Sequence, residues 1–365
     1  MTFTAKLLGA TATAALFTSA AMAGGLDRSG QPVNALFEEG RHLEFSTAFV
    51  RPSLDGVATT GSSRPTGEGP EDYTMLGFAY KDDINDQLSY AIIFDEPYGS
   101  DTKYPATGTT AYSGITSELN SYALTGLLRY EMPSGFSVYG GLKMQSLNAE
   151  AAIPAAAYTV STDTDYALGY VAGVAYERPE IALRVALTYH SEIDHENSTT
   201  ESALGTLPAA TNNLTTTTPD AINLDFQTGV APGTLVFGRI RWADYSEFEL
   251  APANYTTGTG SPLSSYEDDS VSYTLGIGRA ITENFSMAFS VNYEDKGPTA
   301  DSSALSPLNG RIGYTLGGTY TMDNVSITGG ISYTDLGDTT VDSPETAEYR
   351  DNDAIAIGLK IAFKL

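Results

Sequence analysis

The sequence contains no cysteine, and it is poor in basic residues and histidine. Without cysteine, the chain can form no disulfide, thiol nucleophile or cysteine-ligated metal site. Its 19 Lys and Arg residues are outnumbered by 45 Asp and Glu residues, which gives a formal net charge of −26. Nucleic-acid binding needs clustered cations that displace counterions from phosphates, so this composition excludes a nucleic-acid partner.

Long apolar runs are also nearly absent. The one candidate, residues 7–17, follows Lys6 and precedes Ala21-Met22-Ala23, which has the pattern of a signal-peptidase site. A membrane helix needs roughly 20 apolar residues, so we expect residues 1–23 to be a signal peptide that exports the chain. If the mature chain enters a membrane, it must therefore do so as a closed barrel, because no other all-strand structure satisfies its backbone in lipid.

What the chain has instead is a repeated alternation of apolar with polar or small residues. Near the C-terminus, for example, Val325 and Ile327 alternate with Ser326 and Thr328. Successive side chains of a strand point to opposite faces, so the pattern predicts strands with one apolar and one polar face. We expect fourteen such strands, near residues 41–55, 72–82, 87–97, 119–131, 136–148, 164–178, 180–191, 221–230, 234–248, 269–280, 285–296, 310–321, 324–336 and 350–365.

The connections between these segments alternate in length. Those after even-numbered segments are tight, as at residues 132–135, whereas those after odd-numbered segments include residues 98–118, 193–220 and 249–268. A soluble β-sandwich shares the residue alternation but not this rhythm, which is typical of outer-membrane barrels with periplasmic turns and external loops. The sequence therefore predicts an all-β fold, a single closed antiparallel transmembrane β-barrel of about 14 strands over residues 41–365.

Two motifs add a family resemblance. Residues 24–40 read GGLDRSGQPVNALFEEG before the first strand, and residues 241–248 read RWADYSEF. Both resemble segments of the FadL/TodX family of outer-membrane transporters for long-chain fatty acids and other hydrophobic compounds. The family's Asn-Pro-Ala triplet corresponds here to Asn34-Ala35-Leu36, and only a short segment precedes the first strand.

The resemblance implies a function and a location. We expect a bacterial outer-membrane channel for passive uptake of long-chain fatty acids or related hydrophobic compounds, with residues 24–40 as a short N-terminal plug, or hatch, in the lumen. Its expected partners are the hydrophobic substrate, outer-membrane lipid and lipopolysaccharide, and the resemblance implies a monomer without cofactors. The predicted plug residues are Asp27, Arg28, Asn34, Glu38 and Glu39.

Strand parity predicts which side chains face the lumen. If the apolar parity faces lipid, cations dominate the inward positions even though the whole chain is acidic. An anionic headgroup would find partners among these cations, but the cations could equally pair with lumen carboxylates and with the plug. The predicted substrate-binding residues are Arg129, Lys143, Arg184, Arg239 and Arg241.

The resemblance also implies a lateral gap in the wall near the third strand. That strand is expected to end in Asp95, Glu96 and Pro97. Proline has no backbone N–H to donate to a neighbouring strand, so these three residues are the predicted lateral gate. The alternative is an ordinary strand end with proline.

Other functions are less well supported by the residues. A general diffusion porin is the main alternative, and an outer-membrane enzyme or surface-binding barrel is a distant one. Only His42, His190 and His195 could serve as histidine bases, and the spacing of the last two fits no known catalytic or metal motif. We therefore expect exposed loop histidines, no catalytic or metal site, and no enzyme activity.

Overall fold

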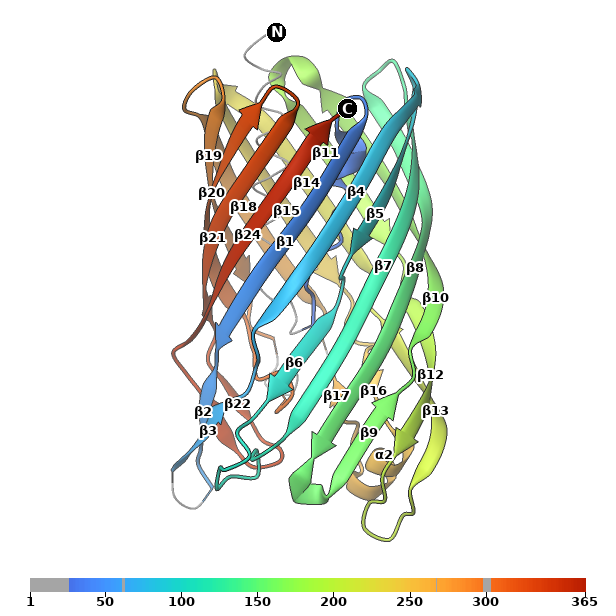
Figure 1. Cartoon of the computed structure of the whole chain (residues 1–365), viewed down its shortest axis with the longest axis vertical. Coiled ribbons are helices and arrows are strands. Elements are labelled where there is room, and N and C mark those ends of the chain that lie inside the picture. Colours follow the sequence, from blue (N-terminus) through green and yellow to red (C-terminus); the bar gives the residue numbers. More distant parts are fainter. Residues whose placement is uncertain (1–25, 61–62, 267, 298–302) are drawn as a thin grey trace.

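The structure, a computed structural model, describes residues 26–60, 63–266, 268–297 and 303–365. It is an elongated barrel of antiparallel strands (Figure 1). The predicted signal peptide, residues 1–23, lies outside the described residues. The wall strands are β1 (His42–Ser53), β4 (Tyr73–Asn85), β5 (Leu88–Asp95), β7 (Thr116–Glu131), β8 (Phe136–Ile153), β10 (Asp165–Arg178), β11 (Leu183–His190), β14 (Ala221–Ala231), β15 (Thr234–Ala243), β18 (Ser270–Ala280), β19 (Phe285–Glu294), β20 (Arg311–Met322), β21 (Val325–Leu336) and β24 (Asn352–Lys364).

The wall closes on itself because β1 pairs with β4 on one side and with β24 on the other. Between them, each wall strand pairs antiparallel with the next wall strand along the chain, up to β21 with β24. The 18-stranded sheet thus consists of fourteen wall strands and four short ones, β6 (Gly99–Lys103), β9 (Tyr158–Thr162), β12 (Ile193–Glu201) and β13 (Ala210–Thr218). The predicted closed fourteen-stranded barrel is confirmed, and closure leaves no continuous open edge in lipid.

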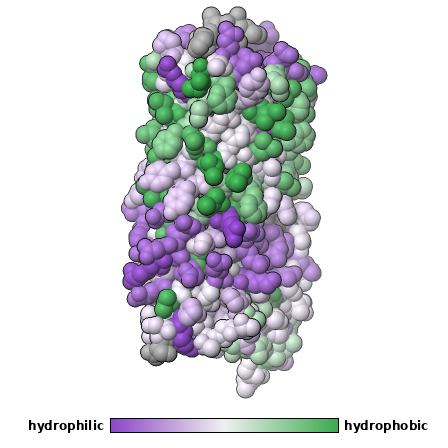
Figure 2. Space-filling view, turned by 60° about the vertical axis from the view of Figure 1, so that its left-hand side comes forward, coloured by the Kyte–Doolittle hydropathy of each residue, from purple (hydrophilic) through white to green (hydrophobic). Residues whose placement is uncertain are grey.

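The two faces of the wall differ in polarity as the alternation predicts. On β8, Leu142 and Met144 point outward and are 64% and 44% exposed, whereas Lys143 and Gln145 point inward and are buried. Figure 2 shows the outward apolar side chains gathered over the upper half of the barrel, with hydrophilic residues below them. The apolar band fits the hydrocarbon core of a membrane, and the hydrophilic part extends beyond it on the side of the long connections.

Short turns and long connections lie at opposite ends of the barrel, as expected. In Figure 1 the turns lie at the top with the C-terminus, and the long connections lie at the bottom. Four short helices also occur in the described residues: η1 (Asn34–Phe37), η2 (Pro154–Ala156), η3 (Pro179–Ile181) and α2 (Ala253–Thr259). No helix in this part of the chain is long and apolar enough to cross a membrane.

The long connections contain more regular structure than predicted. The loops expected over residues 193–220 and 98–118 contain the β12–β13 hairpin and β6, and residues 249–268 contain α2 between β16 (Glu249–Leu250) and β17 (Ser264–Ser265). A separate four-stranded sheet combines β2 (Asp55–Ala58), β3 (Arg64–Glu68), β22 (Thr339–Val341) and β23 (Ala347–Tyr349). The sequence pattern predicted only long external loops at these places, and the short strands and the helix within them were not predicted.

The missed hairpin has a physical explanation in β12. Its buried residues include His195, Asn197 and Thr199, and its exposed residues include Glu196 and Ser198. Both faces are polar because the inward face lines the mouth of a polar barrel. A search for alternation between apolar and polar residues has no signal to detect in such a strand.

Candidate functional site

An N-terminal segment, residues 26–40, lies inside the barrel. Its residues Leu26, Val33 and Leu36 are buried, and η1 (Asn34–Phe37) packs against β4 and β5. From the opposite wall, the Asn223 side-chain amide on β14 donates to the Gly30 carbonyl at 3.1 Å. Contacts with strands on both sides of the lumen hold this segment across the interior.

The two motifs that carried the family resemblance meet in this interior. The Arg241 guanidinium on β15 donates to the Asp27 carboxylate, and both side chains are buried. Leu26 lies in the same apolar cluster as Tyr245 and Phe248, which follow Arg241 in the chain. The N-terminal motif and the RWADYSEF motif are therefore two halves of one docking contact.

The N-terminal segment also pairs, like a strand, with the chain between β5 and β6. The Arg28 N–H donates to the Pro97 carbonyl at 2.9 Å, and the Gly99 N–H donates to the Leu26 carbonyl at 2.9 Å. The Arg28 guanidinium forms an ion pair with Asp101 at 2.5 Å. Residues 26–28 are thereby attached to the stretch where the predicted gate lies.

Two of the predicted substrate-binding cations, Arg239 and Arg241, lie side by side on β15 and already have partners. Arg239 Nε donates to an Asp225 carboxylate oxygen at 2.7 Å, and Arg239 Nη1 donates to the Gly30 carbonyl at 3.3 Å. Arg241 holds Asp27, as described above. Both cations are thus engaged with the N-terminal segment or with a lumen carboxylate.

A third predicted cation, Lys143 on β8, is buried inside the barrel. Its ammonium group donates to the Gln31 side-chain oxygen and lies 3.3 Å from His190 Nδ1. Among the described residues, no carboxylate forms an ion pair with Lys143. Like Arg184, whose guanidinium donates to the Gln227 side-chain oxygen at 3.3 Å, it is a lumen cation without a carboxylate in direct contact among the described residues.

The remaining two, Arg129 and Arg184, enclose a ring of the N-terminal segment. The guanidinium carbon of each lies 4.8 Å from the centroid of the Phe37 ring, a distance typical of a cation–π contact. Tyr139 meets the same ring edge-on, with centroids 5.5 Å apart. Phe37 is thus the apolar anchor at the end of η1, and Arg129 is itself held by an ion pair with Glu177.

Replacing Phe37 by alanine should loosen the N-terminal segment. Burying a phenylalanine is worth about 3–5 kcal/mol in truncation series, so local opening should become at least about 100-fold more frequent. Hydrogen–deuterium exchange at residues 33–39 of the purified protein measures this. Phe136→Ala, which removes a ring from the lipid face, should leave that exchange unchanged. Unchanged protection in Phe37→Ala would show that the ring is no anchor.

The other predicted plug residues take different places. Asn34 lines a cavity described below, and Glu38 ends η1 with its N–H donating to the Ala35 carbonyl at 3.2 Å. Glu39 forms an exposed ion pair with Lys364 at 3.2 Å, at the end of the last wall strand. Such an exposed pair adds little stability.

The wall is interrupted between β4 and β5, beside the predicted gate residues. Pairing of the two strands ends at Phe78 and Phe94, and in the described residues β4 has no strand partner on that side from Tyr73 to Gly77. Further out, contact resumes where the Glu71 N–H donates to the Asp101 carbonyl at 2.9 Å. The result is a bounded opening in the wall, which we call the window.

The break comes from the residues that follow β5. The chain turns inward at Pro97 and Tyr98, and Tyr98 is bound to β7 through Ser121, whose hydroxyl donates to the Tyr98 carbonyl at 2.7 Å. Across the window, Glu96 Oε1 accepts the otherwise unpaired Leu76 N–H at 3.0 Å. A side chain thus replaces the missing strand for one backbone group at the edge.

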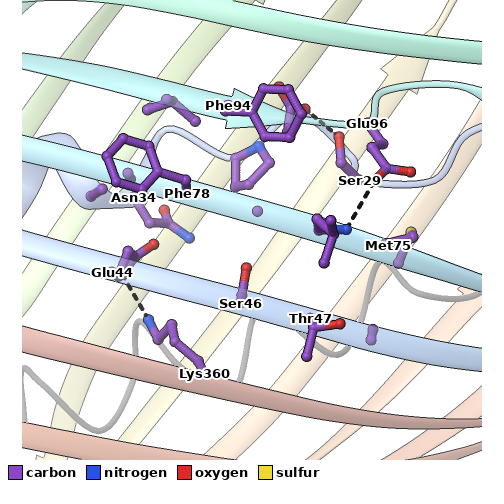
Figure 3. Close-up of a pocket in the computed structure, with 18 of the residues that line it drawn as sticks. Ser29, Asn34, Glu44, Ser46, Thr47, Met75, Phe78, Phe94, Glu96 and Lys360 are labelled. Atoms are coloured by element: carbon purple, nitrogen blue, oxygen red, sulfur yellow. Dashed lines mark hydrogen bonds and ion pairs between the residues drawn. The ribbon is translucent and has the colours of Figure 1, made fainter.

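A cavity of about 80 Å³ runs through this part of the wall. Its lining includes inward side chains, such as Met75 and Asp95, and also Leu76 and Leu359, which are 56% and 43% exposed on the lipid face. Figure 3 shows the lining residues, with Ser29 and Asn34 of the N-terminal segment on the lumen side. A neighbouring cleft of about 360 Å³ is lined by Arg28, Tyr73, Glu96 and Tyr122, among others. We call the two spaces together the passage.

The histidines are not the exposed loop residues that were expected. His190 and His195 are both buried, so this expectation was wrong. His195 lies at the barrel mouth, where its Nδ1 is 3.0 Å from an Asp165 carboxylate oxygen, and burial lowers its pKa. Among the described residues, no group of His, Cys, Asp and Glu could hold a metal ion.

Some site residues were missed by the sequence analysis. Ser29 donates to the Asp95 carboxylate, and Gln31 Nε2 donates to the Tyr98 hydroxyl at 2.9 Å. Gly30 and Gln31 have φ values of 61° and 50°, a left-handed turn that lets this short stretch reach both sides of the lumen. Their position next to Asp27 and Arg28 was the only available signal.

Comparisons with known proteins agree with this architecture. Residues 73–361 match the family described as "Outer membrane protein transport protein (OMPP1/FadL/TodX)". A FadL homologue from Pseudomonas aeruginosa is similar in structure, with a TM-score of 0.73 and 15% identity over 96% of this chain and 98% of that one. The toluene transporter TodX from Pseudomonas putida follows, with a TM-score of 0.66 and 13% identity over 96% and 98%.

A third similar structure is the toluene transporter TbuX from Ralstonia pickettii, with a TM-score of 0.63 and 12% identity over 90% of each chain. Comparison with curated protein sequences finds no match. At these identities the structural likeness shows a common fold, and the family match carries the relationship.

Proposed function

Since the chain belongs to the OMPP1/FadL/TodX family of outer-membrane transport proteins, we propose that it takes up hydrophobic molecules passively and releases them sideways through the window. The observation that carries this proposal is the passage, whose lining joins the lumen face of the wall to its lipid face. A hydrophobic molecule that leaves there enters lipid directly and avoids the water of the periplasm.

The N-terminal segment is proposed to be the plug that controls this route. It occupies the lumen, contributes Ser29 and Asn34 to the passage, and is attached at residues 26–28 to the inner edge of the window. A shift of the segment would therefore alter the lumen and the window together. In this proposal residues 1–23 are the signal peptide, residues 24–40 the plug and residues 41–365 the barrel.

The five lumen cations fit this role in a way that revises the sequence expectation. Arg129, Arg184, Arg239 and Arg241 already contact the plug or lumen side chains, and Lys143 holds Gln31 of the plug. We propose that they anchor the plug in the state described, and that an anionic substrate would reach them only after the plug has moved.

The substrate is proposed to be a hydrophobic compound of the range that includes long-chain fatty acids and aromatic hydrocarbons. TodX and TbuX are toluene transporters, and the lipid-side lip of the passage presents Leu76, Phe78 and Phe94. We also propose a monomer, in contact with outer-membrane lipid and lipopolysaccharide through the apolar band and the hydrophilic part beyond it. A porin is disfavoured because the plug crosses the lumen.

Reconstitution tests the proposal. The purified chain in planar bilayers should give little ion conductance, and cells that express it should take up a radiolabelled hydrophobic compound faster than cells with an empty plasmid. Large, steady conductance together with uptake no faster than in the control cells would favour the porin and contradict the proposal.

A further inference from the structure

The passage has an unusual distribution of charge. Among the described residues, its lining carries the carboxylates of Glu44, Glu71, Asp72, Asp95, Glu96 and Asp101 but only two cations, Arg28 and Lys360. Six acids and two bases give a formal charge of −4. An exit built for carboxylate substrates should have the opposite balance.

Both cations of the lining are already neutralised. Arg28 forms an ion pair with Asp101 at 2.5 Å, and Lys360 forms one with Glu44 at 3.1 Å (Figure 3). The side chains of Arg28 and Lys360 are buried, so water cannot easily compensate if either pair is broken. A substrate carboxylate would therefore have to displace a protein carboxylate from a buried pair, which is costly.

The two carboxyl groups nearest the window differ from those of Asp101 and Glu44, which form ion pairs. Asp95 and Glu96 are buried, at 6% and 7% exposure, and neither forms an ion pair within the described residues. Asp95 accepts a hydrogen bond from Ser29, and Glu96 accepts one from the Leu76 N–H. Each carboxyl group has lone pairs beyond those single bonds, so each can accept a further donor.

Two further lumen cations, Lys143 and Arg241, do not form ion pairs with Asp95 or Glu96 within the described residues. They attract Asp95 from a distance, but Lys143 donates to Gln31 and Arg241 to Asp27. The carboxyl groups of Asp95 and Glu96 thus face the passage without a cation in direct contact. The polar half of the passage offers hydrogen-bonding oxygens, and its lipid-side half is apolar.

We propose that the passage selects uncharged hydrophobic molecules that carry a hydroxyl group, such as alcohols and phenols, over carboxylates with the same apolar body. A hydroxyl group donates to a carboxylate and accepts from a carboxylic acid, so it fits Asp95 and Glu96 in either protonation state. A carboxylate needs a free cation, which this lining does not present. The inference rests on the proposed function and specifies its substrate class.

Uptake of two matched probes tests this selection. Cells that express the full chain are given radiolabelled 1-dodecanol or dodecanoate at neutral pH, and uptake into cells with an empty plasmid is subtracted. We expect protein-dependent uptake of dodecanol to exceed that of dodecanoate by about tenfold or more, because an unpaired buried charge is expensive. Equal uptake of the two probes would overturn the selection and leave the proposed function standing.

Substitutions of Asp95 and Glu96 test whether this selection arises in the passage. In Asp95→Asn/Glu96→Gln the amide oxygens can still accept from Ser29 and Leu76, so the fold should persist while the negative charge is lost. We expect the uptake ratio to fall to about threefold or less, and Glu96→Gln alone to lower it part of the way. The matched control, Asp86→Asn/Glu283→Gln, removes the same charge at turns between wall strands and should keep the wild-type ratio.

The outcomes separate the two proposals. An unchanged ratio in Asp95→Asn/Glu96→Gln would overturn the assignment to these carboxyl groups, and so would an equal fall in the control variant. Uptake of neither probe above the empty-plasmid level would overturn the proposed function itself, and the selection with it.

Discussion

Joining the two edges of the window by a disulfide should stop uptake. The register that pairs Phe78 with Phe94 continues, two residues further along each strand, to Leu76 and Glu96, whose backbone N–H and carboxylate already meet at 3.0 Å. In Leu76→Cys/Glu96→Cys a bond between the new cysteines would draw the edges together across the passage. We expect oxidation to lower uptake of a hydrophobic probe by at least about tenfold, as closure of a gate does.

The chain has no native cysteine, so every disulfide formed within it in this experiment is the engineered one. A second pair, Tyr80→Cys/Ile92→Cys, joins β4 and β5 where they are already paired and should change uptake little on oxidation. Reduction should restore uptake in the window variant. If the crosslinked window variant transports as well as its reduced form, the exit lies elsewhere.

Removing the charge of Asp27 should release the plug and open the lumen to ions. Asp27→Asn leaves the Arg241 guanidinium buried without its carboxylate, and breaking a buried pair on one side costs about 3–5 kcal/mol. That cost corresponds to a change of roughly 100-fold to 4,000-fold in the docking equilibrium. Planar-bilayer recordings should therefore show frequent openings, with deletion of residues 24–40 giving the full conductance.

The charge-swapped variant Asp27→Arg/Arg241→Asp provides the control. It restores a pair of opposite charges at the same two places, so it should recover part of the low conductance that Asp27→Asn loses. Asp86→Asn removes one carboxylate from a turn between β4 and β5 and should conduct like the wild type. Low conductance in both Asp27→Asn and the deletion would mean that residues 24–40 do not close the lumen.

The wall of the barrel was predictable because its signal is local. Alternation sets the face of each side chain, so β20 and β21 appear in the structure within one or two residues of their expected ranges. The predicted ninth strand is an instructive exception, since β15 ends at Ala243 and not at residue 248. Beyond Ala243 the apolar residues do not belong to a wall strand, because Tyr245 and Phe248 pack in the buried cluster that contains Leu26.

The site was predictable only in part, because it depends on contacts between distant segments. Parity places Lys143 and Arg241 in the lumen, but it says nothing of Gln31 and Asp27, which lie more than 100 residues away and hold them. Proline at position 97 suggested that strand pairing is interrupted there. The size of the window, however, depends on where the chain contacts the wall again, at Asp101, and the sequence pattern does not predict that contact. The pairing of residues 26–28 with the chain around Pro97 has no sequence periodicity that could reveal it.

Photochemical capture of a substrate on its way out tests the central proposal of lateral release most directly. A long-chain alcohol that carries a diazirine in its alkyl chain would be taken up by cells expressing the chain, irradiated during transport and mapped by mass spectrometry. Lateral release predicts adducts on the passage, in residues 75–79 and 93–96. Adducts confined to the turn end of the lumen, around Arg129 and Arg184, would contradict it and indicate release into the periplasm.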